Sequence, residues 1–493
     1  VSAEATYSGT ASAYINYIDA DANSSGTAAV SIGGDVSVQA QGVDGAYAYV
    51  HYISASGYSV SNGLAQVGIG GSVLVSASAS AGAAYAYIDY ISAYVGDNAY
   101  AGVGISGDVA VEAHGTSYAQ AYVYEISASG YTGSGTAEVM IGGSVLVSAT
   151  ASAGSASAYI GYITADDNAS NYAGVSIGGD VSIQAQGEGD ANAYIYEISA
   201  SAESGFAGVG IDGSVLVSAE ATYSGTASAY INYITADANS SGFAGVSIGG
   251  DVSVQAQGVD GAYAYVHDIT ASASYATSGT AAVAIGGSVL VSASASAGAA
   301  YAYIDYISAY VGDNAYAGVG ISGDVAVEAH GTSYAQAYVY EISASGYTGS
   351  GTAEVMIGGS VLVSATASAG SASAYIGYIT ADDNASNYAG VSIGGDVSIQ
   401  AQGEGDANAY IYEISASAES GFAGVGIDGS VLVSAEATYS GTASAYINYI
   451  DADANSSGTA AVSIGGDVSV QAQGVDGAYA YVHYISASGY SVS

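Results

Sequence analysis

One short acidic run has the residue types and spacing of a cation-binding loop. Asp19, Asp21 and Asn23 alternate with alanines, as the first ligands of Ca²⁺ loops alternate with other residues. The glycine and the distal bidentate glutamate of such loops are misplaced or absent, and the copy of this run at residue 235 begins with threonine. We therefore favour a solvated turn, with a weak, non-catalytic site for Ca²⁺ or another divalent cation as the alternative. No other cofactor is expected.

Two glycine-rich runs, at residues 102–107 and 208–213, match the dinucleotide fingerprint G-x-G-x-x-G. That motif requires a following helix whose N-terminus binds the pyrophosphate, whereas here another β-type run follows. A corner between two strands is the interpretation that we favour.

The histidines also have a simple structural interpretation. None has a second histidine or a cysteine at metal-ligand spacing, so a solvent-facing place on a strand is expected for all of them. They are copies of two sequence positions: His51, His114, His267, His330 and His483. A Ser-His-Asp triad has its residue types available, but tandem copies without a unique insertion are a poor basis for one active site. We therefore expect no catalytic residues and no enzyme activity.

The charge of the chain restricts its partners. Its 493 residues include 43 aspartates and glutamates and no lysine or arginine, which gives a formal net charge of -43. Nucleic acids and anionic membrane surfaces are bound through lysine and arginine, so both are excluded as partners. No run of apolar residues is long enough to span a membrane. Copies of the chain itself are the expected partners, with glycans or cations as further candidates.

The chain is built from tandem repeats. Residues 69–216 recur without change at 285–432, and residues 1–61 recur at 433–493. The sequence therefore predicts one continuous repeat rod over 1–493, made of blocks 1–216 and 217–432 and the partial block 433–493. Because the chain ends within a repeat, we interpret it as a window of a longer protein.

Each block contains a shorter unit of 34 to 37 residues, marked by the signature Ile-x-Gly-[Asp/Ser]-Val. The residue before the valine alternates strictly between two unit types: Asp35, Ser72, Asp108, Ser144, Asp180, Ser214 and Asp251. Like charges directly opposite one another on neighbouring strands are destabilising. The alternation would keep these aspartates two units apart.

Three runs with β-type patterns occur in each unit, for example Val36–Gln41, Ala46–Ile53 and Gly63–Ile69. Such a short unit cannot bury a core alone, but stacked units can pair each strand with its equivalent in the next coil. The sequence therefore predicts an all-β fold, a parallel β-solenoid of about 36-residue coils with three short strands per coil and two coil types alternating. At about 4.8 Å per coil, 13 to 14 coils would form a rod of roughly 65 Å.

A tyrosine recurs in the second run of every unit, and stacking of the coils would align these residues into a ladder. Intramolecular stacking and adhesion between rods are equally weighted interpretations. The tyrosines are Tyr14, Tyr49, Tyr87, Tyr122, Tyr159, Tyr194 and Tyr230. N-glycosylation sequons follow the same run, so glycans are a further candidate modification if the protein is exported. They lie at Asn23, Asn168, Asn239, Asn384 and Asn455.

The runs Gly33–Ala40 and Gly70–Ala77 resemble the Gly-Asp-hydrophobic repeats of filamentous-haemagglutinin-like exoproteins and giant bacterial surface adhesins. The resemblance implies a secreted, rod-shaped parallel β-solenoid at the cell surface or outside the cell. We therefore expect a self-associating structural shaft of an extracellular filament or giant surface protein. The alternative is an adhesin or surface-binding module for carbohydrate, a mineral or ice surface, or other cells.

Overall fold

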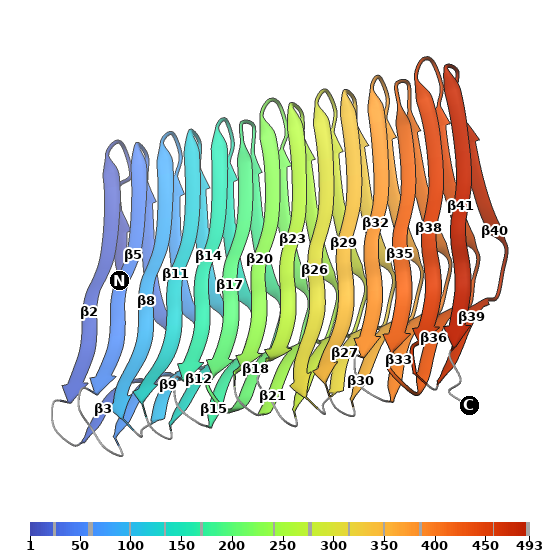
Figure 1. The fold of residues 1–493 in the computed structure, drawn as a ribbon. Coiled ribbons are helices and arrows are strands. Elements are labelled where there is room, and N and C mark those ends of the chain that lie inside the picture. The colour runs from blue at the N-terminus through green and yellow to red at the C-terminus, as the bar shows by residue number, and fades with distance from the viewer. Residues whose placement is uncertain are drawn as a thin grey trace. The chain divides into compact units, whose positions relative to one another are not determined.

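The computed structural model in Figure 1 contains strands and no helix among its described residues. It describes residues 1–22, 26–57, 63–97, 100–132, 135–167, 171–239, 242–274, 279–313, 316–348, 351–383, 387–456 and 458–489. Within these ranges, no helix is available that could cross a membrane. The chain divides into two compact units, residues 1–243 with 247–249, and residues 244–246 with 250–493.

The first unit is a parallel β-solenoid with three sheets, here called the first, second and third sheets in the order in which the chain enters them. Neighbours in each sheet come from consecutive coils. The first sheet has the order β1 (Ser2–Glu4), β4 (Val36–Gly42), β7 (Val73–Ala79), β10 (Val109–Gly115), β13 (Val145–Ala151), β16 (Val181–Gly187) and β19 (Val215–Ala221). The second has β2 (Thr10–Ala22), β5 (Gly45–Gly57), β8 (Ala83–Asp97), β11 (Tyr118–Thr132), β14 (Ser155–Asp167), β17 (Ala191–Ala202) and β20 (Thr226–Ala238). The third has β3 (Thr27–Ile32), β6 (Leu64–Ile69), β9 (Tyr100–Ile105), β12 (Thr136–Ile141), β15 (Tyr172–Ile177) and β18 (Gly205–Ile211).

Strand β21 (Gly242–Ile248) contains the boundary, and the second unit has the same three-sheet architecture. Its first sheet has the order β22 (Val252–Gly258), β25 (Val289–Ala295), β28 (Val325–Gly331), β31 (Val361–Ala367), β34 (Val397–Gly403), β37 (Val431–Ala437) and β40 (Val468–Gln473). Its second sheet has β23 (Gly261–Ala273), β26 (Ala299–Asp313), β29 (Tyr334–Thr348), β32 (Ser371–Asp383), β35 (Ala407–Ala418), β38 (Thr442–Ala454) and β41 (Gly477–Gly489). Its third has β24 (Thr280–Ile285), β27 (Tyr316–Ile321), β30 (Thr352–Ile357), β33 (Tyr388–Ile393), β36 (Phe422–Ile427) and β39 (Thr459–Ile464).

The core of each unit is made of small and β-branched side chains on the inward face of every strand. In β7, Val73, Val75 and Ala77 are fully buried, and the residues between them face outward. Equivalent residues pair in parallel register, as Val73 does with Val109 in the next coil. The predicted all-β solenoid with three strands per coil is confirmed. The glycine fingerprint at residues 102–107 lies in β9 and in the corner before β10, where a strand follows instead of a helix.

The second strand of each coil is longer than predicted. The sequence pattern suggested Ala46–Ile53, whereas β5 has 13 residues and ends at Gly57. Residues 54–57 read Ser-Ala-Ser-Gly, which are weak strand formers or common turn residues, but they extend β5 because they pair in register with residues 92–95 of the next coil. The burial pattern of β5 also shifts phase: Val50 and Ile53 are both buried, and the two residues between them both face outward. A strict period of two therefore breaks at this point although the backbone continues as a strand. These two outward residues of each coil belong to the exposed surface of the second sheet.

The alternating aspartates and serines form a hydrogen-bond ladder at the corner before the first sheet. The backbone N–H of Ser144 donates to Asp108 Oδ1 at 2.8 Å, and the backbone N–H of Asp180 donates to Ser144 Oγ at 3.1 Å. Each side chain thus satisfies a backbone donor of the following coil. The preceding glycine leaves the space for it, because a Cβ atom at Gly143 would overlap Asp108 Oδ1. This is a structural reason for the Gly-[Asp/Ser] signature.

Candidate functional site

The predicted tyrosines form one row along the second sheet, here called the first tyrosine row. Tyr49 pairs in register with Tyr87, and their rings stack at a centroid distance of 4.8 Å and an interplanar angle of 3°. The ring of Tyr122 instead stands at 84° to that of Tyr87. All seven predicted residues of the first unit lie in this row, and the second unit has an equivalent row of its own: Tyr265, Tyr303, Tyr338, Tyr375, Tyr410, Tyr446 and Tyr481.

Two phenols of this row, those of Tyr49 and Tyr265, remain uncharged over the physiological range because their pKa values are raised. Burial, followed by the neighbouring tyrosines and Asp89, raises the pKa of Tyr49 to about 12. Burial and Asp305 raise the pKa of Tyr265 to about 12 in the second unit. These two tyrosines therefore add no negative charge to a chain that already carries many carboxylates.

A second tyrosine row lies beside the first and was missed by the sequence reasoning. Tyr52 stacks on Tyr90 at 4.9 Å, and Tyr124 meets Tyr90 at 5.2 Å with an angle of 71°. Each coil of the first unit supplies one tyrosine from one of the two outward positions at the phase shift: Tyr17, Tyr52, Tyr90, Tyr124, Tyr162, Tyr196 and Tyr233. The signal was present, because every coil of the first unit has a tyrosine either two or three residues after its first-row tyrosine.

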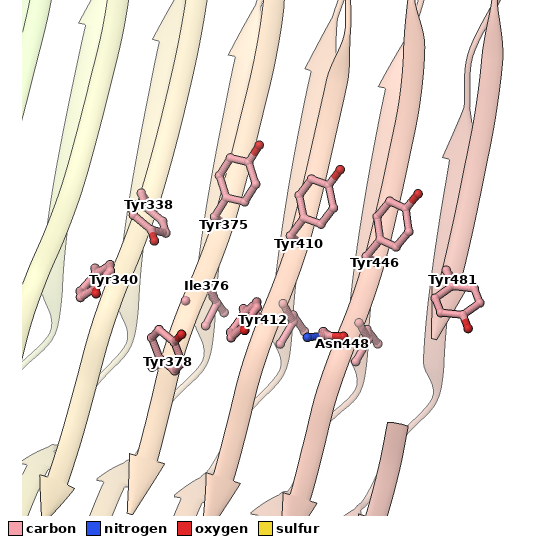
Figure 2. A pocket seen from close by; sticks show the side chains of 13 residues that line it. Tyr338, Tyr340, Tyr375, Ile376, Tyr378, Tyr410, Tyr412, Tyr446, Asn448 and Tyr481 are labelled. Carbon is pink, nitrogen blue, oxygen red and sulfur yellow. The ribbon is translucent and has the colours of Figure 1, made fainter. Parts of the chain in front are cut away.

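A groove separates the two rows in the second unit (Figure 2). Its volume is about 640 Å³. The first-row rings of Tyr375, Tyr410 and Tyr446 lie along one side with their hydroxyls pointing in the same direction. Tyr378 and Tyr412 of the second row line the other side. Gly377 lies in the groove at the outward position that carries a side chain in neighbouring coils, so the surface is hollowed there.

Carboxylates accompany the second row. Glu341 and Glu413 are the register partners of Tyr378 on either side, and each accepts a hydrogen bond from a serine two residues along its strand, at 2.6 and 2.7 Å. Burial, followed by the charges of Glu413, Glu341 and Asp451, raises the pKa of Asp382 to about 6. The acidic surface and the tyrosine groove are therefore neighbours on the second sheet.

The raised carboxyl pKa values predict that mild acid stabilises the fold. Burial also raises the pKa of Asp268 to about 6, although His267 and a hydrogen bond with Thr270 oppose the shift. Between the ordinary value of 3.8 and about 6, the folded chain binds more protons at these groups than the unfolded chain. The free energy of unfolding should therefore rise as the pH falls through that window. We expect a higher Tm at about pH 5 than at about pH 7.

Thermal unfolding of an Asp268→Asn, Asp382→Asn variant tests this expectation. The variant should lose part of the pH dependence, while a Glu328→Gln, Glu436→Gln control on the first sheet should keep it. A Tm that falls on acidification in the parent chain would contradict the assignment.

The candidate cation ligands and the sequon asparagines lie in different parts of the chain, and some lie outside the described residues. Asp19 and Asp21 lie in β2, so the turn expected for them is wrong; the strand continues because they pair in register with Ser54 and Ser56 of the next coil. Asn23 lies outside the described residues, as do Asn168 and Asn384. Asn239 follows β20 and is half-buried, whereas Asn455 follows β38 and is exposed. No group of three or more metal-ligating side chains occurs in the described part of the chain.

Histidines lie on outward positions of the first and second sheets. His51 Nδ1 lies 2.6 Å from Asp89 Oδ2 of the next coil, and about a third of the imidazole side chain is exposed. His267 Nε2 lies 3.9 Å from Asp305 Oδ2 with a more exposed ring. His330 on the first sheet is half exposed, and its Nε2 lies 4.0 Å from Glu328 Oε2.

No protein-family model matches the chain, and neither does a curated protein or a solved structure. The parallel β-solenoid that the sequence resemblance implies is present, without a family assignment. The surface features relevant to function are therefore the two tyrosine rows, the groove and the flanking carboxylates.

Proposed function

We propose that the chain is a structural β-solenoid segment, the shaft of an extracellular filament or giant surface protein, and that it associates with copies of itself. The observation that carries this proposal is the uninterrupted coil-to-coil register within each unit, with the same buried alanine, valine and isoleucine positions in successive coils. Stability in such an architecture is approximately the sum of neighbouring coil contacts, so it suits an extended element. The absence of lysine and arginine supports an extracellular place, because trypsin-type proteases have no cleavage site.

The second sheet supplies the surface that we propose for association between copies. Among its aromatic side chains, Tyr196 and Tyr412 expose 44% and 48% of their surface. Aromatic rings are favourable contact residues because they bury a large area and lose little conformational entropy. These two tyrosines are equivalent residues of the two sequence blocks and can be changed together.

Electron microscopy of the recombinant chain tests the association. The Tyr196→Ser, Tyr412→Ser variant should remain folded but form fewer lateral bundles than the parent in the same salt. Tyr223→Ser, Tyr439→Ser is a matched control, because these tyrosines are 79% and 78% exposed at a corner outside the second sheet. If the first variant bundles like the parent, the tyrosine rows serve only intramolecular packing. Single globular particles without axial repeat in the parent would refute the shaft itself.

A further inference from the structure

The groove between the tyrosine rows has walls suited to an elongated ligand with apolar segments. It runs past four successive coils of the second unit, from Tyr338 to Tyr446, and ends at Tyr481. The rings differ in orientation: Tyr375 and Tyr410 are parallel within 4°, whereas Tyr338 and Tyr340 stand at 78° to each other. Both faces and edges of aromatic rings therefore lie along the groove. Aromatic faces attract cations through their quadrupole, most strongly where water is partly excluded.

Carboxylates on the strands either side of Tyr378, which itself lines the groove, select the sign of the ligand. Glu341 and Glu413 lie two coils apart on either side of Tyr378, which corresponds to about 9.6 Å. Asp382 and Asp451 lie close enough to interact electrostatically with Glu413. The chain has no lysine or arginine with which to balance any of these carboxylates. An anion is therefore disfavoured here.

The spacing of the carboxylates along the axis favours a long ligand over a compact one. The carboxylates are strung along the axis, and the described residues contain no cluster that would enclose a compact metal ion. A chain of ammonium groups joined by methylene segments can meet carboxylates that are several ångströms apart. Its methylene segments can at the same time bury apolar surface against tyrosine rings.

We propose that this groove binds a linear organic oligocation of the polyamine class, with ammonium groups at Glu341 and Glu413 and methylene segments on the rings of Tyr378 and Tyr410. The inference goes beyond the shaft role, because it assigns a ligand to one face of a single chain. Residues 122–196 repeat the sequence of 338–412 without change, so the same side chains are present in the first unit. Glu125 and Glu197 correspond there to Glu341 and Glu413.

Isothermal titration of the full chain with spermine tests the proposal, with Mg²⁺ and NaCl titrations at equal ionic strength for comparison. We expect saturable spermine binding that is at least about tenfold tighter than Mg²⁺ binding. The variant Glu125→Gln, Glu197→Gln, Glu341→Gln, Glu413→Gln should weaken spermine binding by about tenfold or more. The matched control changes the same number of carboxylates on the first sheet in both blocks: Glu112→Gln, Glu220→Gln, Glu328→Gln and Glu436→Gln. This control should bind like the parent.

A second variant tests the contribution of the aromatic wall to spermine binding separately from that of the charges. Tyr162→Ser, Tyr378→Ser keeps every carboxylate and should still lose affinity for spermine; circular dichroism checks that each variant retains its β-structure. Equal loss in the second-sheet and first-sheet carboxylate variants would reveal diffuse screening of the net charge and overturn the proposal. Unchanged binding by the tyrosine variant would also overturn it. Light scattering reports bundling separately, so failure of this site and failure of the shaft role are distinguishable.

Discussion

Gly298→Ala is expected to destabilise the chain by about 3 kcal/mol or more, whereas Gly320→Ala in a neighbouring strand should change its stability by only about 0.5 kcal/mol. Gly298 lies at the corner between β25 and β26, and a Cβ atom there would overlap the backbone carbonyl oxygen of Asp260 in the preceding coil. That oxygen belongs to the backbone and cannot rotate away. At Gly320 in β27 a Cβ atom meets nothing within 4 Å.

Urea unfolding of the full chain, followed by circular dichroism, measures both variants. The two substitutions add the same methyl group, so their effects on the unfolded chain are nearly equal. Gly82 is the equivalent of Gly298 in the other sequence block, and a Cβ atom there would overlap the carbonyl oxygen of Asp44. Gly82→Ala should therefore repeat the effect in the first unit. Equal unfolding midpoints for Gly298→Ala and Gly320→Ala would show that the coils are more loosely stacked than the structure indicates.

Replacing the corner serines of the second unit by aspartate should cost about 1 to 5 kcal/mol at low salt. The triple variant Ser288→Asp, Ser360→Asp, Ser430→Asp would turn the alternating ladder into an unbroken run of aspartates. Charges then face each other across single coils at about 4.8 Å, where repulsion in water is about 0.9 kcal/mol per pair. The parent separates its aspartates by a serine whose Oγ accepts the next backbone N–H, as Ser360 does from Asp396 at 3.1 Å.

Denaturant unfolding at low and high salt distinguishes this repulsion from a loss of hydrogen bonds. Added salt should restore most of the lost stability, because it screens exposed charges. The asparagine variant Ser288→Asn, Ser360→Asn, Ser430→Asn is the control, since it offers a similar acceptor without charge. If the aspartate and asparagine variants are equally stable at low salt, the alternation has a reason other than electrostatics.

Much of the coil could be predicted because its pattern is local. The valines at Val36 and Val73 mark the start of a strand, and the residues that alternate with them predict which side is buried. Because the blocks are identical in sequence, equivalent coils are expected to have the same conformation. The extent of the second strand was not predictable in this way, because residues 54–57 are mostly of types common in turns, and they belong to β5 through their pairing with the next coil.

The candidate site was likewise predictable only in part. The first tyrosine row follows from one fixed position per coil, so the sequence alone placed Tyr49 opposite Tyr87. The second row draws Tyr90 and Tyr124 from different positions of their coils, and their rings can meet because both of these adjacent positions face outward.

By itself, the sequence determined the repeat, the three strands per coil, the buried face and the strongly acidic character of this protein. These properties depend on residue spacing and composition, which repeat along the chain. Only the tertiary structure decided that Asp108 caps Ser144, that Gly298 lies against Asp260, and that a groove with flanking carboxylates runs between two tyrosine rows. Each of these contacts joins residues more than 30 positions apart, and their geometry depends on the side chains of the neighbouring coil and on the register in which the coils stack.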